Sequence, residues 1–188
     1  SYVAVQVQPY TQHLINLGHT RIGTISGSPS RTPFTAEFDR ESGFAQAMSR
    51  ANIQVDPMLE AYGHFSIEGG EAAMTALLTQ AQPPTAVFAL SDEMAFGALR
   101  PLRAHDMRPG KDVSVVGVDG HDMAEYLGLT TVVQPVVELG RIAAESFLAQ
   151  MGEGAAQPES TQVATHLVVR ESTGPVAGHR STSSKDGR

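Results

Sequence analysis

Short apolar runs alternate with longer segments of helical spacing, and this alternation constrains the fold more than any other feature of the sequence. The runs are rich in β-branched residues and lie at 21–25, 86–90, 113–118 and 164–169. Between them, apolar residues recur every three or four positions, as they do on one face of a helix. The four stripes are Phe44, Ala47, Met48 and Ala51; Gly69, Ala73, Ala76 and Leu77; Met94, Ala95, Ala98, Leu99 and Leu102; and Leu139, Ala143 and Phe147. Strands alternating with helices predict an α/β fold with a mostly parallel sheet flanked by helices.

Several residues mark where these elements begin or end. Ser66 precedes the second stripe, and Ser91 with Asp92 precedes the third, so each can accept a hydrogen bond from a free N–H group at a helix start. Pro101 lies within the third stripe and removes a backbone donor, which predicts a kink or an early stop of that helix.

Three segments show neither the apolar runs nor the helical spacing. Residues 26–39 form a long polar connection, of a length that is often functional. Residues 152–161 are typical of a solvated loop, and the small, polar residues 174–188 predict a disordered tail.

Composition excludes several classes of protein. The chain has 188 residues, no cysteine and a net charge of −7, so it has no disulfide framework, thiolate zinc site or cysteine nucleophile. Residues 174–188 carry three basic side chains against one acidic side chain, a net +2, so the rest of the chain carries −9. An acidic body is a poor surface for nucleic acid. No apolar run approaches the roughly 18 residues that a membrane helix needs.

The sequence contains none of the common catalytic motifs. It has no phosphate-binding glycine loop, no HExxH pair and no GxSxG elbow. His121 and Asp122, close to Asp119, are the one cluster with metal-ligand chemistry, and a solvated loop after a strand is the more common origin of such a cluster. We therefore expect no catalytic residue, no metal and no cofactor.

Parallel sheets bind ligands beyond the carboxyl ends of their strands. That rule selects segment 26–40, the region of Phe65, the Ser91–Asp92 pair and segment 119–122. Arg40, Asp119 and Ser91 could fix ligand hydroxyls there, and Phe65 could supply a flat apolar wall. The alternatives are that Asp119 caps the next element, that Arg40 is a surface residue at a helix start, and that Phe65 belongs to the core.

A series of strings runs through residues 11–173 in one order: HLINLGHTRIG at 13–23, RESGF at 40–44, DP at 56–57, GHFSIEGG at 63–70, PPTAVFA at 83–89, SDEMAFGA at 91–98, DVSVVGVD at 112–119, LTTVVQP at 129–135 and LVVRES at 167–172. Together these strings resemble the LacI family of bacterial transcription regulators. The resemblance implies a type I periplasmic-binding-protein-like core, in which an effector binds between two α/β subdomains, with a helix-turn-helix domain upstream.

The resemblance also implies that the chain is a C-terminal fragment of such a regulator. Residues 1–17 would be a remnant of the N-terminal subdomain, and residues 18–131 the C-terminal effector-binding subdomain. Residues 132–151 would cross to the N-terminal subdomain as a connection and a helix, and 160–173 would return as the final strand before the tail.

Five residues correspond to the family's ligand cleft. The resemblance makes Arg40 the cleft arginine, Phe65 the aromatic residue that stacks on the ligand, and Asp119 the acceptor for sugar hydroxyls or a base edge. Gln134 matches a polar residue near the crossover, and Ser91 replaces a common Asn. Gly120 likewise replaces the second Asp of a usual pair, so the effector's identity stays open.

Phe96 and Tyr126 correspond to dimer-interface positions, although Phe96 could equally belong to the core. The chain is thus interpreted as the effector-sensing domain of a cytoplasmic regulator that forms a homodimer and reaches operator DNA only through a missing N-terminal domain. Its effector would be a carbohydrate or a nucleobase, and it would have no membrane partner. The alternatives are a periplasmic sugar-binding protein of an ABC transporter and, with the least support, an enzyme on the same fold.

Overall fold

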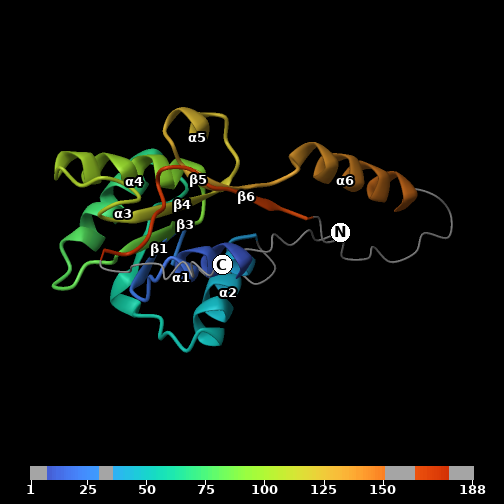
Figure 1. Ribbon diagram of the computed structural model, residues 1–188. Helices are drawn as coiled ribbons and strands as arrows, with labels where there is room; N and C mark the ends of the chain where they lie inside the picture. Colours follow the sequence, from blue (N-terminus) through green and yellow to red (C-terminus); the bar gives the residue numbers. More distant parts are fainter. Residues whose placement is uncertain (1–7, 30–35, 151–163, 178–188) are drawn as a thin grey trace, which may run out of the picture.

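A six-stranded sheet forms the centre of the chain in a computed structural model that describes residues 8–29, 36–150 and 164–177 (Figure 1). The spatial order is β2-β1-β3-β4-β5-β6, and every neighbouring pair is parallel except β5 and β6. The strands are β1 (Ile22–Ser26), β2 (Glu60–Tyr62), β3 (Ala86–Ala89), β4 (Ser114–Asp119), β5 (Thr130–Val133) and β6 (His166–Val168). The predicted α/β fold with a mostly parallel sheet is confirmed.

Four of these strands, β1, β3, β4 and β6, coincide with the predicted apolar runs to within two residues at every end. β2 and β5 were not among the predicted strands. β2 is three residues long and half-buried at the edge of the sheet, so its composition carries little strand pattern. β5 is short as well, with the sequence TTVV.

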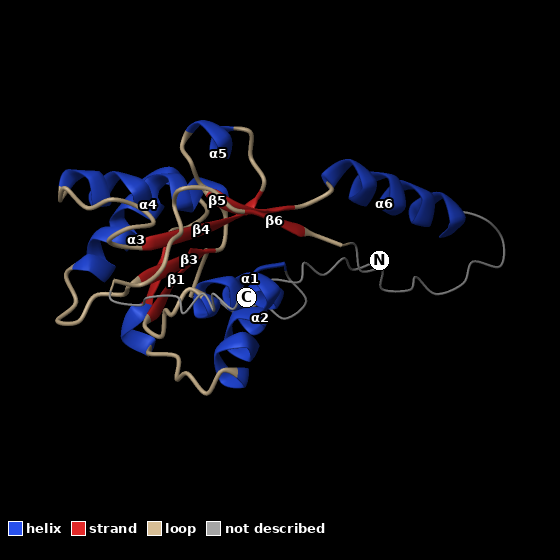
Figure 2. Cartoon of the chain, in the orientation of Figure 1, coloured by secondary structure: helices blue, strands red, loops and turns tan. Residues whose placement is uncertain are grey.

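Helices cover both faces of the sheet (Figure 2). α3 and α4 pack along each other on one side, and α1 packs against α2 on the other. The helices are α1 (Gln8–Asn16), α2 (Ala36–Arg50), α3 (Ile67–Leu78), α4 (Asp92–Ala104), α5 (Met123–Tyr126) and α6 (Val136–Gln150), with a 3₁₀ turn η1 (Pro57–Leu59) before β2. None of the helices among the described residues is long and apolar enough to cross a membrane.

The third predicted stripe is entirely buried on α4, and it forms the core together with β3, β4 and α3. α3 and α4 approach closely because Gly97 has no side chain: a Cβ there would overlap the carbonyl oxygen of Ile67. In the second stripe Ala73 and Leu77 are buried, whereas Ala76 is exposed. The helix caps are confirmed, since Ser66 Oγ accepts from Gly69 N at 3.0 Å and Ser91 Oγ accepts from Met94 N at 3.2 Å.

Pro101 does not stop α4 early, because the helix continues to Ala104. Pro101 lies in the last turn, where the single missing backbone donor removes only the bond to Gly97.

The fourth predicted stripe is not buried. Leu139 on α6 is half-buried, whereas Ala143 and Phe147 are exposed. α6 extends away from the sheet, and the other described elements make only marginal contact with it (Figure 1).

Residues 8–16 belong to this domain rather than to a remnant of another one. They form α1, whose Leu14 is fully buried and whose Tyr10 packs in the same core as the sheet. The expected crossover at residue 132 also begins slightly later, because Val132 and Val133 are still paired in β5.

The predicted tail is attached over its first four residues. The carbonyl of Gly174 accepts from Ser114 Oγ at 3.1 Å, and Val176 N donates to the carbonyl of Leu17 at 3.0 Å. These bonds hold residues 174–177 against the amino-terminal edge of the sheet, so the prediction of disorder is wrong for them. The rest of the predicted tail, and the predicted loop 152–161, lie outside the described residues.

Candidate functional site

Three polar side chains from distant parts of the chain meet at the carboxyl edge of the sheet. Arg40 comes from α2, Asp119 ends β4 and Gln134 directly follows β5. Arg40 Nη2 donates to Asp119 Oδ1 at 3.0 Å, and Gln134 Nε2 donates to the same oxygen at 2.6 Å. We call Arg40, Asp119 and Gln134 the edge cluster. The topological rule selected the segments of Arg40 and Asp119, the resemblance added Gln134, and the structure brings the three side chains together.

Arg40 is the most buried member of the edge cluster. Its side chain is 9% exposed, compared with 35% for that of Asp119. Nη1 of Arg40 donates to the carbonyl of Leu90, which directly follows β3, while Nε has no partner among the described residues. The guanidinium is therefore fixed from two sides, and one buried donor remains for a further acceptor. The alternative that Arg40 is a surface residue is wrong.

Burial dominates the electrostatics of Asp119. It raises the pKa of this carboxyl, and the nearby charges of Asp92 and Glu93 add to the rise, while the Arg40 charge opposes it. Asp119 does not cap the next helix, because α5 begins at Met123 and Asp122 holds its N-cap position. A partly buried carboxylate with one open side is a good acceptor for ligand hydroxyl or N–H groups.

Phe65 is 46% exposed, so the core alternative is wrong for this residue. It follows β2 at the same edge of the sheet, and both it and His64 have positive φ values, of 51° each. The ring lies against Gly27, where a Cβ would overlap it. An exposed aromatic face held by a glycine contact suits the predicted stacking role.

Ser91 reaches the same edge, but its side chain is 2% exposed and its oxygen caps α4. Its hydroxyl hydrogen and one lone pair of the oxygen are left for other contacts. The common Asn that it replaces in the family would present a longer side chain here.

Sequence reasoning missed the role of Asp92, which it treated as a possible helix cap and as part of a candidate ligand segment. The Asp92 side chain is fully buried; Oδ1 accepts from Thr131 Oγ1 at 2.6 Å and Oδ2 accepts from His121 N at 2.7 Å. Burial raises the pKa of this carboxyl, and its hydrogen bonds oppose the rise. The spacing could have indicated that Asp92 is buried, because residue 92 lies three positions before Ala95 and seven before Leu99, on the buried stripe of α4.

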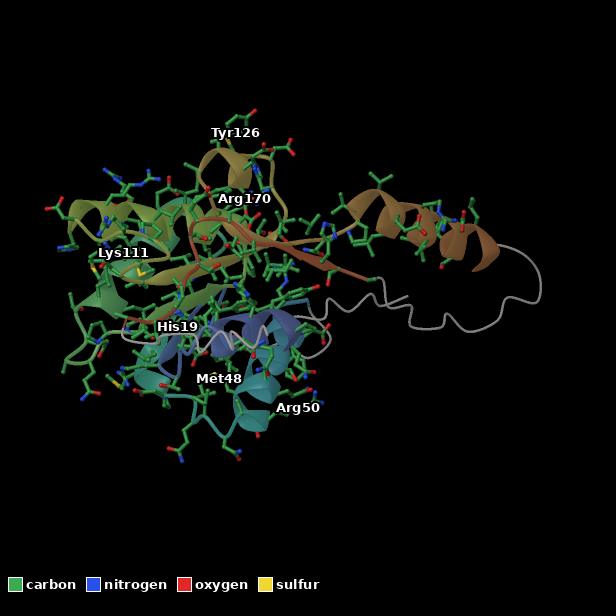
Figure 3. All side chains as sticks on the ribbon, viewed as in Figure 1. His19, Met48, Arg50, Lys111, Tyr126 and Arg170 are labelled. Carbon is green, nitrogen blue, oxygen red and sulfur yellow. The ribbon has the colours of Figure 1, made fainter. Side chains whose placement is uncertain are left out.

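The two predicted interface residues differ in exposure. Tyr126 is 82% exposed, and Figure 3 shows it at the outer tip of α5. Phe96 is half-buried, packs against the core and meets the His121 ring edge-to-face at 5.5 Å between centroids. His121 itself accepts from Met123 N through Nδ1 at 3.0 Å. Among the described residues, no three His, Asp or Glu side chains are placed to hold a metal ion.

A separate hollow of about 250 Å³ lies between α2 and the β1–β2 edge of the sheet. None of the predicted ligand residues lines it. Its walls are Thr24, Ser26, Phe38, Glu41, Ser42, Phe44, Ala45, Val55 and Glu60.

An open parallel sheet with polar side chains gathered at its carboxyl edge is the arrangement at which α/β domains commonly bind ligands. Residues 11–173 match the periplasmic binding protein-like domain family, and the chain belongs to that family.

The relatives of the chain are LacI-family regulators. The chain is 40% identical over 164 residues to the HTH-type transcriptional regulator CelR of Thermobifida fusca, covering 86% of this chain and 47% of that protein. It is 39% identical over 163 residues to the HTH-type transcriptional repressor CytR of Escherichia coli K12, with the same coverage. The chain thus spans about half the length of these curated relatives.

Solved structures give the same assignment. A complex of the transcriptional regulator CelR with cellobiose superposes with a TM-score of 0.83 at 38% identity, over 92% of this chain and 54% of that one. A LacI-family regulator from Enterococcus faecium with bound ribose superposes with a TM-score of 0.80 at 31% identity, over 92% of this chain and 65% of that one. The resemblance to LacI-family regulators is therefore confirmed.

Proposed function

We propose that this chain is the effector-sensing part of a LacI-type transcription regulator, and that it holds a small polar ligand at the edge cluster. The edge cluster carries the proposal: a buried guanidinium, a half-buried carboxylate and an amide converge where parallel sheets bind ligands. These groups complement vicinal hydroxyls or the edge of a base. An uncharged sugar or a nucleobase-containing molecule is therefore the ligand class we favour.

Arg40, Asp119 and Gln134 would contact the polar groups of the ligand, and Phe65 would stack on its flat face. Ser91 would add one hydroxyl donor. Two relatives fit this class, since solved structures of regulators of this family hold cellobiose and ribose. Neither ligand is thereby assigned to this chain.

The exposed apolar side chains of α6 support the proposal that this helix packs in a second subdomain. Val136, Val137, Phe147 and Leu148 are all more than 60% exposed, which is unusual for so many large apolar side chains on one helix. We propose that α6 completes a second subdomain, and that the ligand sits between the two subdomains. Ligand binding would then favour one relative arrangement of the subdomains and shift a population of dimers between DNA-competent and DNA-incompetent states.

Dimerisation would use the surface of α5 and the start of α4. Tyr126 and Met123 are exposed there, at 82% and 46%, and the half-buried ring of Phe96 on α4 contacts the His121 ring just before α5. DNA contact would belong to an upstream domain of a cytoplasmic regulator, because the net charge of the chain is −7. We favour this assignment over a transporter's sugar-binding protein and over an enzyme because the matched relatives are transcription regulators.

A ligand-observed NMR screen of the purified chain tests the proposal, because it detects weak complexes. The probes are cellobiose, ribose, cytidine and hypoxanthine. We expect saturation transfer to at least one probe, and loss of that transfer in Arg40→Met. The matched control is Arg100→Met on α4, which makes the same substitution in an exposed ion pair with Glu71 on α3. No transfer to any probe, or equal transfer in the two variants, would overturn the proposal.

A further inference from the structure

We infer that Asp92 is a positioning residue for the candidate site: its carboxylate fixes the turn after β4 and thereby directs Asp119 toward Arg40 and Gln134. The importance of this role for binding rests on the proposed function. The role itself rests on contacts of the turn that involve no ligand.

The Asp92 carboxylate is not used for capping, although it stands at the first position of α4. Ser91 Oγ already accepts the hydrogen bond from Met94 N. The Asp92 side chain turns inward instead and is fully buried. A buried carboxylate is unfavourable unless hydrogen-bond donors surround it, so its partners are expected to be specific.

Those partners come from two other elements. Thr131 on β5 donates its hydroxyl to Oδ1 at 2.6 Å, and His121 in the turn after β4 donates its backbone N–H to Oδ2 at 2.7 Å. Asp92 therefore joins α4, β5 and the turn at one point. Hydrogen bonds to an ionised acceptor are about twice as strong as neutral ones.

β4 makes room for the Asp92 side chain at Gly117. Gly117 on β4 faces the Asp92 carboxylate, and a Cβ at this position would overlap Oδ1. Gly117 thus lies among the buried valines Val115, Val116 and Val118 of β4, and the Asp92 side chain occupies the space that a larger residue would fill. This placement explains Gly117 without any special backbone angle.

The backbone of the turn requires such support. Asp119 has a φ of 134°, a region that residues other than glycine rarely adopt, and Gly120 follows at 75°. A conformation of this kind persists only where the surroundings fix it. Two contacts do so: Gly120 N donates to Thr131 Oγ1 at 3.3 Å, and His121 N donates to Asp92. Thr131 and Asp92 thus clamp the residues that immediately follow Asp119.

NMR of the full chain tests this role without any ligand. The three-bond coupling between HN and Hα of Asp119 reports its φ, and the side-chain NH₂ signals of Gln134 report the contact with Asp119. In Asp92→Ala we expect the coupling to change, the Gln134 signals to move, and exchange of the His121 amide to accelerate at least about tenfold. Thr131→Val removes the donor to Asp92 Oδ1 and the acceptor of Gly120 N but leaves the bond between His121 N and Asp92. It should change the Asp119 coupling and the Gln134 signals in the same direction, which keeps the test valid if Asp92→Ala does not fold.

Asp92→Asn is the conservative variant. Its amide oxygen accepts from His121 N while its NH₂ group donates to Thr131 Oγ1, so we expect it to restore the coupling of Asp119. Asp56→Ala is the matched control, because Asp56 also accepts a backbone N–H, from Met58 at 3.0 Å, at a different place in the fold. An unchanged coupling of Asp119 in Asp92→Ala, or no restoration in Asp92→Asn, would overturn the inference. Absence of ligand binding would contradict the proposed function alone.

Discussion

The contact between Arg40 and Asp119 supports a quantitative prediction about stability. Arg40→Met keeps an apolar stem of similar length and removes the guanidinium. The variant loses the charge-assisted bond to Asp119 and the bond to the carbonyl of Leu90, and it leaves both acceptors without this partner.

The magnitude follows from those two bonds. Both bonds have the charged guanidinium as donor, and a hydrogen bond that involves a charged group contributes about 1.5–3 kcal/mol. Water reaches Asp119, whose side chain is 35% exposed, and replaces part of the first contribution. We therefore expect Arg40→Met to lower the free energy of unfolding by roughly 3–5 kcal/mol. The coupling energy between the Arg40 and Asp119 side chains should account for about 1 kcal/mol of this loss.

Urea unfolding at pH 7 of the wild type, Arg40→Met, Asp119→Asn and the double variant gives this coupling directly. The exposed pair Arg100–Glu71, at 2.9 Å, provides the comparison cycle through Arg100→Met and Glu71→Gln. Exposed pairs couple by roughly 0.2–1 kcal/mol, and the 77% exposure of Arg100 favours the low end of that range. If the two cycles gave equal coupling energies, the account of Arg40 as a buried, fixed donor would be refuted.

Two further predictions concern the core and the opposite edge of the sheet. Gly97→Ala should destabilise the chain by about 1–3 kcal/mol or more, because the new methyl group forces α3 and α4 apart; a urea midpoint equal to that of the wild type would contradict the close approach. Burial lowers the pKa of His19 below its ordinary 6.5, so the unfolded chain binds the proton more readily, and stability should fall as the pH drops below that value. The urea midpoint measured from pH 7.5 downward should therefore depend less on pH in His19→Gln, and an unchanged dependence would exclude His19 as a cause.

Sequence patterns predicted the parts of this fold that depend on local periodicity. The β-branched runs gave β1, β3 and β4, and the stripe from Met94 to Leu102 gave the buried face of α4. The convergence of Arg40, Asp119 and Gln134 followed from a topological rule and from the family resemblance, since spacing alone does not bring such distant residues together.

The features that sequence reasoning missed depend on non-local contacts. The α6 pattern identifies an apolar face but does not show what covers it. Residues 174–177 are held by hydrogen bonds to the backbone of Leu17 and to Ser114 Oγ, and the composition of the segment does not indicate such bonds. Asp92 resembled a helix cap because its true partners, Thr131 and His121, lie far along the chain.

Mapping the ligand on the protein is the most direct test of the central claim. The measurement is a titration of isotopically labelled chain with the probe that gives the strongest saturation transfer, followed through the side-chain signals of Gln134 and the Nε–H of Arg40. The account predicts that these signals and the Phe65 ring shift together, while the His19 ring at the opposite edge of the sheet does not. Shifts confined to Thr24, Phe44 and Val55 would place the ligand in the hollow beside α2 and contradict the account.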